Sequence, residues 1–265
     1  MKVRSLGRRT DFIFAGFSGS IEDKGSYTLI KTPRNPGYHW GNYIVFDRAP
    51  KPGDLAEWKA LFDKEFPYYS EPHHYVFTWD TEVNDKGEFQ EFLEDGFEFD
   101  SAVVLTTKTL KEPPHINEDI FIRKIESDSD WEEVIKLQTL CADPKFLNDY
   151  YEDFKRSQVS QYRKMSQAGK GNWFGAFIDG QMVGDLGIFS EGSIGRYQNV
   201  GTHPDFRRRG ICGTLVYKAG LIALDEFGIE ALVMEADPEY HAARIYESVG
   251  FVRSEINYSL SWWKG

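Results

Sequence analysis

Two adjacent prolines near the middle of the 265-residue chain divide it into two parts. Pro113 and Pro114 lie in the segment LKEPPHINED (110–119), where charged residues flank them. Proline removes an amide donor and disfavours helix at the residue before it, so we expect an extended linker here. A chain of this length forms one large domain or two modest ones. We therefore predict two domains, at residues 1–112 and 117–265.

Similar elements are expected on both sides of this linker, because β-branched and aromatic runs predict strands and helical apolar spacing predicts helices. In the first part we expect strands at 26–32, 42–46, 74–79 and 97–107, a helix from 55 capped by Asp54, and a short helix at 88–95. In the second part we expect strands at 119–125, 173–179, 181–189, 194–202, 230–236 and 251–262, and helices from 127 or 128, at 146–168, at 210–227 and at 237–249. The mixture predicts an α+β (mixed α/β) fold class.

The two parts also end alike. The segment FLEDGFEFDSAVVL (92–105) aligns with YESVGFVRSEINYS (246–259), with Gly96 over Gly250 and Phe97 over Phe251. Each segment predicts a helix that ends at a left-handed glycine, followed by a buried phenylalanine that opens a strand. The join is common in proteins, but the similar order of elements before it favours an internal duplication.

Composition and charge exclude several classes of protein. Apolar residues make up 41% of the chain and aromatic residues 15%, which is enough for packed cores and excludes general disorder. No apolar run is long enough for a membrane span or a secretion signal. The net charge of −11 gives no basic face for nucleic acid. The two cysteines, Cys141 and Cys212, have neither disulfide nor metal-ligand spacing, so we expect a cytoplasmic protein without a metal.

The segment QNVGTHPDFRRRGICGTLVY (198–217) carries the clearest functional pattern. A strand leads into a basic turn, and small residues then open an amphipathic helix. The unpaired N–H groups of a first helical turn, with the positive end of the helix dipole, form an anion site. The arginines add positive charge, so a pyrophosphate fits this turn better than a single carboxylate does. The turn contains Arg207, Arg208, Arg209, Gly210, Ile211, Cys212, Gly213 and Thr214.

This segment could also be another type of phosphate loop or a helix start with no binding role. Neither of the two common glycine-rich phosphate loops occurs in the chain. A helix that merely starts with small residues after a solvated arginine run remains the plain structural alternative, although the order strand, proline, arginines, glycine argues against it.

The segment 198–217 resembles a motif of the GNAT superfamily of N-acetyltransferases. The family's acyl-CoA motif is Arg/Gln-x-x-Gly-x-Gly/Ala, and Arg207, Gly210 and Cys212 occupy its positions. A second family motif is matched by HAARIYESVGF, whose matching residues are Ala242, Tyr246, Gly250 and Phe251. An asparagine frequent in the family is replaced by Glu239. The resemblance covers about residues 118–265 and implies a mostly antiparallel central sheet flanked by helices in each of two GNAT-like domains.

The resemblance also implies a cosubstrate and a set of contacts. Acetyl-CoA would bind through the 207–214 turn and through the strand residues Val200, Gly201 and Thr202, where the strand diverges from its neighbour. In the first part, the loop DRAPKPGDL (47–55) stands where the phosphate turn should be. Pro50 and Pro52 cannot donate hydrogen bonds there, so this part is predicted to be a degenerate copy without a CoA site.

The resemblance implies that an amine of the acceptor attacks the acetyl thioester directly. A backbone N–H near Val200 or Gly201 would stabilise the oxyanion, and Tyr246 would protonate the leaving thiolate; a purely packing role is the alternative for Tyr246. The general base stays open between Glu235, Asp185 and a water chain.

Other titratable residues are assigned no chemistry. His203 and His241 are expected to be surface or capping residues, and Cys212 is expected to be a small buried residue. His73 and His74 should point to opposite strand faces and so cannot pair as metal ligands.

A protein that binds acyl-CoA without turnover, or a structural protein of the same fold, is the alternative to an enzyme. The sequence does not identify the acceptor amine, and an oligomer is possible.

Overall fold

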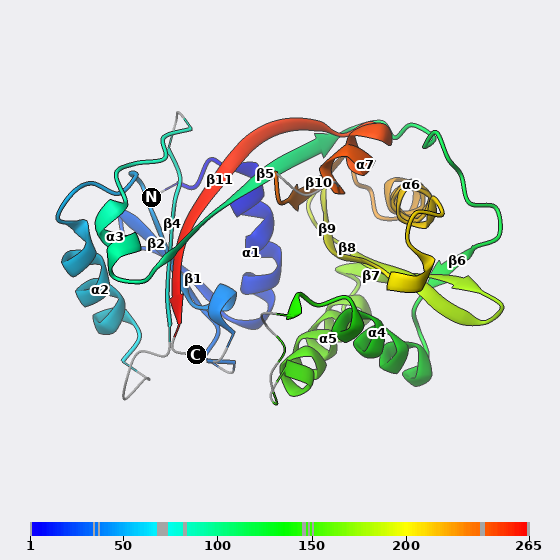
Figure 1. The fold of residues 1–265 in the computed structure, drawn as a ribbon, viewed down its shortest axis with the longest axis horizontal. Helices are drawn as coiled ribbons and strands as arrows, with labels where there is room; N and C mark the ends of the chain where they lie inside the picture. The colour runs from blue at the N-terminus through cyan, green and yellow to red at the C-terminus, as the bar shows by residue number, and fades with distance from the viewer. Residues whose placement is uncertain are drawn as a thin grey trace. The chain divides into compact units, whose positions relative to one another are not determined.

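The computed structural model describes residues 2–33, 35–36, 38–67, 74–81, 84–144, 147, 149, 151–238 and 242–263. The chain packs as two compact units (Figure 1). The first unit comprises Met1–Val104 and Glu255–Gly265, and the second comprises Leu105–Ser254. His73, Glu239 and His241 lie outside the described residues.

This division differs from the predicted one at both ends of the second unit. Residues 105–112 belong to the second unit, and residues 255–265 belong to the first. The reason is strand pairing: β11 (Val252–Trp263) pairs antiparallel with β4 (His74–Trp79), with Ser259 opposite Thr78. Strand β5 (Glu98–Thr107) likewise begins in the first unit and ends in the second. The prolines therefore lie inside the second unit and not at its boundary.

The first unit is a mixed sheet with helices. Its strand order is β1-β2-β3-β4-β11, in which only β3 and β4 are parallel among the pairings described. Its remaining elements are α1 (Leu6–Ser18), β1 (Ser20–Asp23), β2 (Tyr27–Lys31), the 3₁₀ helix η1 (His39–Gly41), β3 (Tyr43–Phe46), α2 (Asp54–Glu65) and α3 (Gln90–Glu94). The expected strands at 26–32, 42–46 and 74–79 are confirmed within one residue at each end.

Helix α1 and strand β1 were not predicted, and Asp54 does not cap α2. The first turn of α1 contains no acidic residue; its N–H groups at Leu6 and Gly7 donate instead to the Glu255 carboxylate of β11, at 2.9 and 3.4 Å. The N-cap of α2 is Gly53, at φ +94°, and Asp54 is the first helical residue. The Asp54 carboxylate accepts from the N–H of Lys51 at 2.7 Å and pairs with a guanidinium nitrogen of Arg48 at 2.8 Å.

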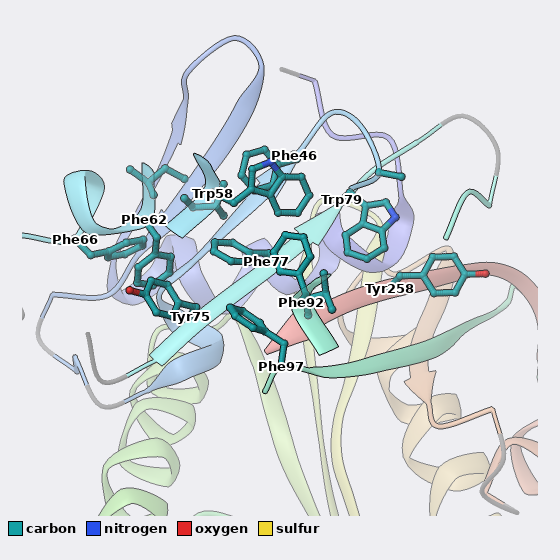
Figure 2. Packing of buried hydrophobic residues seen from close by; sticks show 14 residues of the cluster. Phe46, Trp58, Phe62, Phe66, Tyr75, Phe77, Trp79, Phe92, Phe97 and Tyr258 are labelled. Atoms are coloured by element: carbon teal, nitrogen blue, oxygen red, sulfur yellow. The ribbon is translucent and has the colours of Figure 1, made fainter. Parts of the chain in front are cut away.

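Aromatic side chains fill the core of the first unit (Figure 2). Phe46 stacks on Trp58 with ring centroids 3.8 Å apart, and Phe77 meets Trp58 edge-on at 5.5 Å. Such pairs contribute about 0.5–1.5 kcal/mol each beyond the burial of their area. The other labelled members of the cluster are Phe62, Phe66, Tyr75, Trp79, Phe92, Phe97 and Tyr258, the last of which comes from β11. The last strand thus contributes to the packing of the first unit as well as to its sheet.

The second unit has a sheet of order β10-β9-β8-β7-β6, covered by helices on both faces (Figure 1). Helices α4 and α5 lie on one face, where Tyr162 of α5 stacks on Trp173 of β7 at 4.9 Å. Helix α6 covers the other face. The elements are β6 (Phe121–Lys124), α4 (Asp128–Leu140), α5 (Tyr151–Gln167), β7 (Gly171–Ile178), β8 (Gln181–Glu191), β9 (Ile194–Thr202), the 3₁₀ helix η3 (Pro204–Phe206), α6 (Ile211–Glu226), β10 (Ala231–Ala236) and α7 (Ala242–Ser248).

The internal repeat predicted from the sequence is present in the structure. The N–H of Phe97 donates to the carbonyl of Phe92 at 2.9 Å, and the N–H of Phe251 donates to the carbonyl of Tyr246 at 3.2 Å. The glycines between them have φ of +89° and +100°. Both units also have an antiparallel pair followed by a parallel pair, β2-β3-β4 in the first and β8-β9-β10 in the second. The same chain geometry therefore occurs twice.

Among the described residues, no helix combines the length and the apolar character that a membrane crossing requires. They also contain no group of three or more histidine, cysteine, aspartate or glutamate side chains placed to hold a metal ion.

Candidate active site

Strand β9 leaves its parallel neighbour part-way along its length. It pairs with β10 at Ile194, Gly195 and Arg196, and in these two fully described strands no pairing follows beyond Arg196. On its other side β9 carries a bulge, because Asp185 of β8 faces Gly201 while Gly187 faces Gln198. Asn199 sits in the bulge with φ of +47°. Residues 200–202 therefore have backbone groups that β10 does not use.

Helix α6 begins close to the end of β9, and its first turn exposes unused donors. The helix starts after Gly210, which has φ of +75°, and the first N–H of the helix with a backbone acceptor belongs to Thr214, at 3.0 Å from the Gly210 carbonyl. Within the part of the chain described, the N–H groups of Ile211, Cys212 and Gly213 have no acceptor. Three such donors at the positive end of a sixteen-residue helix form an anion site.

The three arginines before this turn are exposed. The Nε of Arg207 donates to the carbonyl of Thr202 at 3.2 Å, which ties the turn to the end of β9. Arg208 has a left-handed backbone with φ of +63°. The linker stabilises the turn from outside, because the Asn117 side chain donates to the Arg209 carbonyl at 2.8 Å. The structure therefore brings Val200–Thr202 and the 207–214 turn together, as the predicted site requires.

A buried polar cluster supports the bulge from the α4 side. The Asp185 side chain is completely buried; Oδ1 accepts from Nε2 of Gln138 at 2.8 Å, and Oδ2 accepts from Nε1 of Trp173 at 2.9 Å. The same Gln138 nitrogen donates to the Asn199 carbonyl at 2.8 Å. Burial raises the pKa of Asp185 to about 7, against the opposing effect of its hydrogen-bond donors. Because both of its oxygens are engaged, Asp185 holds the bulge in place and does not face an acceptor.

This cluster leads to a prediction about stability. Between pH 4 and 7 the folded protein retains the Asp185 proton and the unfolded chain releases it, so rising pH should destabilise the fold. The full effect is about 4 kcal/mol, from about three pKa units at 1.36 kcal/mol each. We expect Asp185→Asn to lack this loss, so that its free energy of unfolding relative to the wild type improves from pH 5 to pH 7.5. Urea unfolding at both pH values tests this, and parallel profiles would contradict it.

The two cysteines are placed for packing and not for nucleophilic attack. Burial raises the pKa of Cys212 to about 12, and it also raises the pKa of Cys141. The Cys141 thiol donates to the Thr202 carbonyl at 3.3 Å. Both thiols therefore stay protonated at neutral pH, and the cysteines are free of disulfide bonds.

The remaining sequence candidates lie on separate elements. Tyr246 is buried in α7 at 6% exposure. The pKa of Tyr197 on β9 is raised mainly by burial and, to a smaller extent, by the charge of Tyr246. Tyr246 therefore lies close to that strand. Glu235 is the next-to-last residue of β10, with its carboxylate 3.1 Å from the Arg196 guanidinium. His203 caps the 3₁₀ helix η3 by accepting from the N–H of Asp205 at 3.3 Å.

Comparison with known proteins identifies the class of this site. Residues 169–253, which include β8, β9 and the phosphate turn, match the acetyltransferase (GNAT) domain family. Residues 169–253 of the second unit thus resemble a GNAT domain. No curated protein sequence matches the chain with significance.

Solved structures share the fold of nearly the whole chain. A functionally unknown conserved protein from Staphylococcus epidermidis aligns with a TM-score of 0.76 at 17% identity over 92% of this chain and 93% of its own. A GCN5-related N-acetyltransferase from Kribbella flavida aligns at 0.64 and 13% identity over 98% of both chains. A tandem GNAT protein from the clavulanic acid biosynthesis pathway aligns at 0.55 and 12% identity over 90% of this chain and 82% of its own. At these identities the likeness concerns the fold alone.

Helix α2 of the first unit begins much as α6 begins in the second, and a carboxylate lies at its N-terminus. Helix α2 follows β3 as α6 follows β9, and its N-cap Gly53 is left-handed like Gly210. The N–H groups of Gly53 and Leu55 donate to the two oxygens of Glu91 in α3, at 3.1 and 2.9 Å. Glu91 was not singled out from the sequence, since only the fold brings it to the α2 terminus. Its negative charge lies at the positive end of the α2 dipole.

Proposed function

We propose that the protein is an N-acetyltransferase that moves the acetyl group of acetyl-CoA to a primary amine of a small acceptor. One observation carries the proposal: the part of β9 that leaves β10 lies beside a helix terminus with three unused N–H groups. The first feature supplies extended backbone for the pantetheine arm, and the second supplies donors for the pyrophosphate. The proposed contacts are Val200, Gly201 and Thr202 for the arm, and Arg207–Thr214 for the phosphates.

The proposed reaction needs an electrophilic site, a proton donor and an unprotonated amine. The backbone N–H of Val200 or Gly201, next to the bulge, stabilises the oxyanion as the amine nitrogen forms its bond to the acetyl carbon. The carbon–sulfur bond then breaks, and Tyr246 gives its hydroxyl proton to the departing thiolate. Asp185 already accepts hydrogen bonds from Trp173 and Gln138. Glu235 already pairs with Arg196. The amine proton therefore leaves to water in the cleft.

A thiol-release assay with acetyl-CoA and a panel of amines tests the proposal. The expected result is CoA release that depends on both the amine and the protein, with the acetylated amine recovered in equal amount. CoA binding without any release, across amines of varied size and charge, would instead support a binding module of the same fold.

Size measurements in solution will show whether the protein is an oligomer. Its cytoplasmic location stays a prediction.

The first unit is proposed to bind no CoA. The N–H groups at the start of its helix α2 already donate to the Glu91 carboxylate. Pro50 and Pro52 have no N–H and so remove donors from the loop before that helix. Calorimetry should give one CoA per chain. Glu91→Gln, which keeps the size and removes the charge, should leave CoA affinity unchanged while it lowers the stability of the first unit. A stoichiometry of two would contradict the degenerate-copy interpretation.

A further inference from the structure

Lys155 of α5 is a buried ammonium that forms no ion pair with any carboxylate of the described residues. The residue is 6% exposed, and its Nζ donates to Oε1 of Gln158 at 2.8 Å. The ring centroids of Tyr151 and Phe154 lie 5.6 and 5.7 Å from Nζ. Among the described residues no carboxylate forms an ion pair with it. An ammonium carries three N–H donors, so two of them are left without a described hydrogen-bond acceptor.

Such a charge is costly to bury. Lysine is almost never fully buried unless it is paired, and an unpaired buried ion costs several kcal/mol. Burial accordingly lowers the pKa of Lys155 to about 8, which still leaves most of the population protonated at neutral pH. Asp185 is the one carboxylate that raises this pKa, and it is itself only partly ionised at neutral pH because burial raises its own pKa to about 7. The fold therefore keeps a positive charge in its interior that nothing described neutralises.

The ammonium lies next to the part of β9 that is proposed to act in catalysis. The Gln158 oxygen that accepts from Lys155 also accepts from Nδ2 of Asn199 in the bulge, at 3.3 Å. One helical turn further along α5, the Tyr162 hydroxyl accepts from Nε2 of Gln198 at 2.9 Å. Lys155, Gln158 and Tyr162 thus form one face of α5 directed toward the divergent end of β9. Lys155 is separated from the bulge by a single side chain.

We propose that Lys155 binds a carboxylate carried by the acceptor, so that the acceptor class is small amines that also bear a carboxylate, such as amino acids. The inference rests on the proposed acetyltransferase function. A carboxylate matches the single positive charge of Lys155 and can accept from both remaining N–H groups. A phosphate monoester carries close to two negative charges, one more than this ammonium can balance. The carboxylate holds the molecule on α5 while its amine reaches the bulge.

Matched pairs of acceptors test this assignment. The ω-amino acids from glycine to 6-aminohexanoate are compared with n-alkylamines of the same chain length, and kcat/KM is measured by thiol release. In the wild type at least one amino acid should exceed its matched alkylamine by about tenfold or more, the value of a buried charge-assisted contact. Lys155→Met should abolish that preference and leave the alkylamine rates nearly unchanged. Lys164→Met, an exposed lysine on the same helix, is the control and should keep the preference.

A second measurement separates this proposal from the proposed function. Propionate has the carboxylate but no amine, so its binding does not depend on turnover. Calorimetry should show propionate binding to the wild type and to Lys164→Met, and at least about tenfold weaker binding to Lys155→Met. If CoA binds but no amine is acetylated, the acetyltransferase function fails while the propionate result still decides the carboxylate site. Equal loss of rate on amino acids and alkylamines, or propionate binding that Lys155→Met leaves unchanged, would overturn the assignment.

Discussion

Replacing Tyr246 by phenylalanine should lower kcat by roughly ten- to a thousandfold, the range of a lost general acid. The KM for acetyl-CoA should change little, because the ring keeps its buried position in α7 and only the hydroxyl is lost. The rate of the wild type should also fall at alkaline pH as the hydroxyl ionises, and the variant should lack that decline. Steady-state kinetics across pH, with the best amine found, measures all three effects.

The companion variants define what Tyr246→Phe means. Glu235→Gln breaks the ion pair with Arg196 but removes no proposed catalytic group, so its kcat should stay near that of the wild type. If kcat falls in Glu235→Gln but not in Tyr246→Phe, Glu235 on β10 would be the general base and the acid role of Tyr246 would be wrong. Wild-type kcat in Tyr246→Phe, with the chemical step rate-limiting, would show that the hydroxyl is structural and that water protonates the thiolate.

CoA affinity should fall at least about tenfold when Arg208 is replaced by glutamate. The arginine is exposed in the turn, so the change reverses a charge beside the proposed phosphates without disturbing a core. Arg208→Gly removes the charge and relieves the left-handed backbone at φ +63°, so it should bind CoA more weakly than the wild type and better than Arg208→Glu. Isothermal calorimetry gives the affinities, and the differences should shrink as salt is added.

Two further variants complete this test. Lys170→Glu makes the same charge change at an exposed position outside the turn, and it should leave CoA affinity unchanged. Gly210→Pro should abolish binding, but proline cannot adopt φ of +75°, and a Cβ at this position would meet the His115 carbonyl at 2.5 Å. Its folding must therefore be checked by circular dichroism. Unchanged affinity in Arg208→Glu would place the phosphates elsewhere.

The sequence predicted local elements better than it predicted tertiary partners. Strand β9 was predicted at its observed bounds, because its residues and its flanking glycine and proline are local signals. Helix α1 was missed because its negative N-terminal partner, Glu255, comes from the other end of the chain. The same reason explains why Gln138, Lys155 and Glu91 carried no signal: each gains its meaning from a residue that only the fold brings near.

The candidate site divides in the same way. Its phosphate turn is a short continuous motif, so Gly210 and its neighbours could be predicted from spacing alone. The proposed acceptor side combines α4, α5 and the bulge of β9, and hydrogen bonds such as Gln138 to Asp185 span many residues of sequence. Asp185 was considered as a base because it is acidic and near the site. The structure shows that burial and two donors give it a supporting position instead.

The pairing of β11 with β4 also determines when the first unit can fold. Ribosomes release a chain from its N-terminus, and domains commonly fold in that order during synthesis. Here Tyr258 and the strand that carries it are translated after the entire second unit, so the aromatic core of the first unit stays incomplete until then. Strand β4 is left with an open edge throughout synthesis, which is a template for aggregation. A nascent chain stalled after the second unit should therefore be held by chaperones at its N-terminal part.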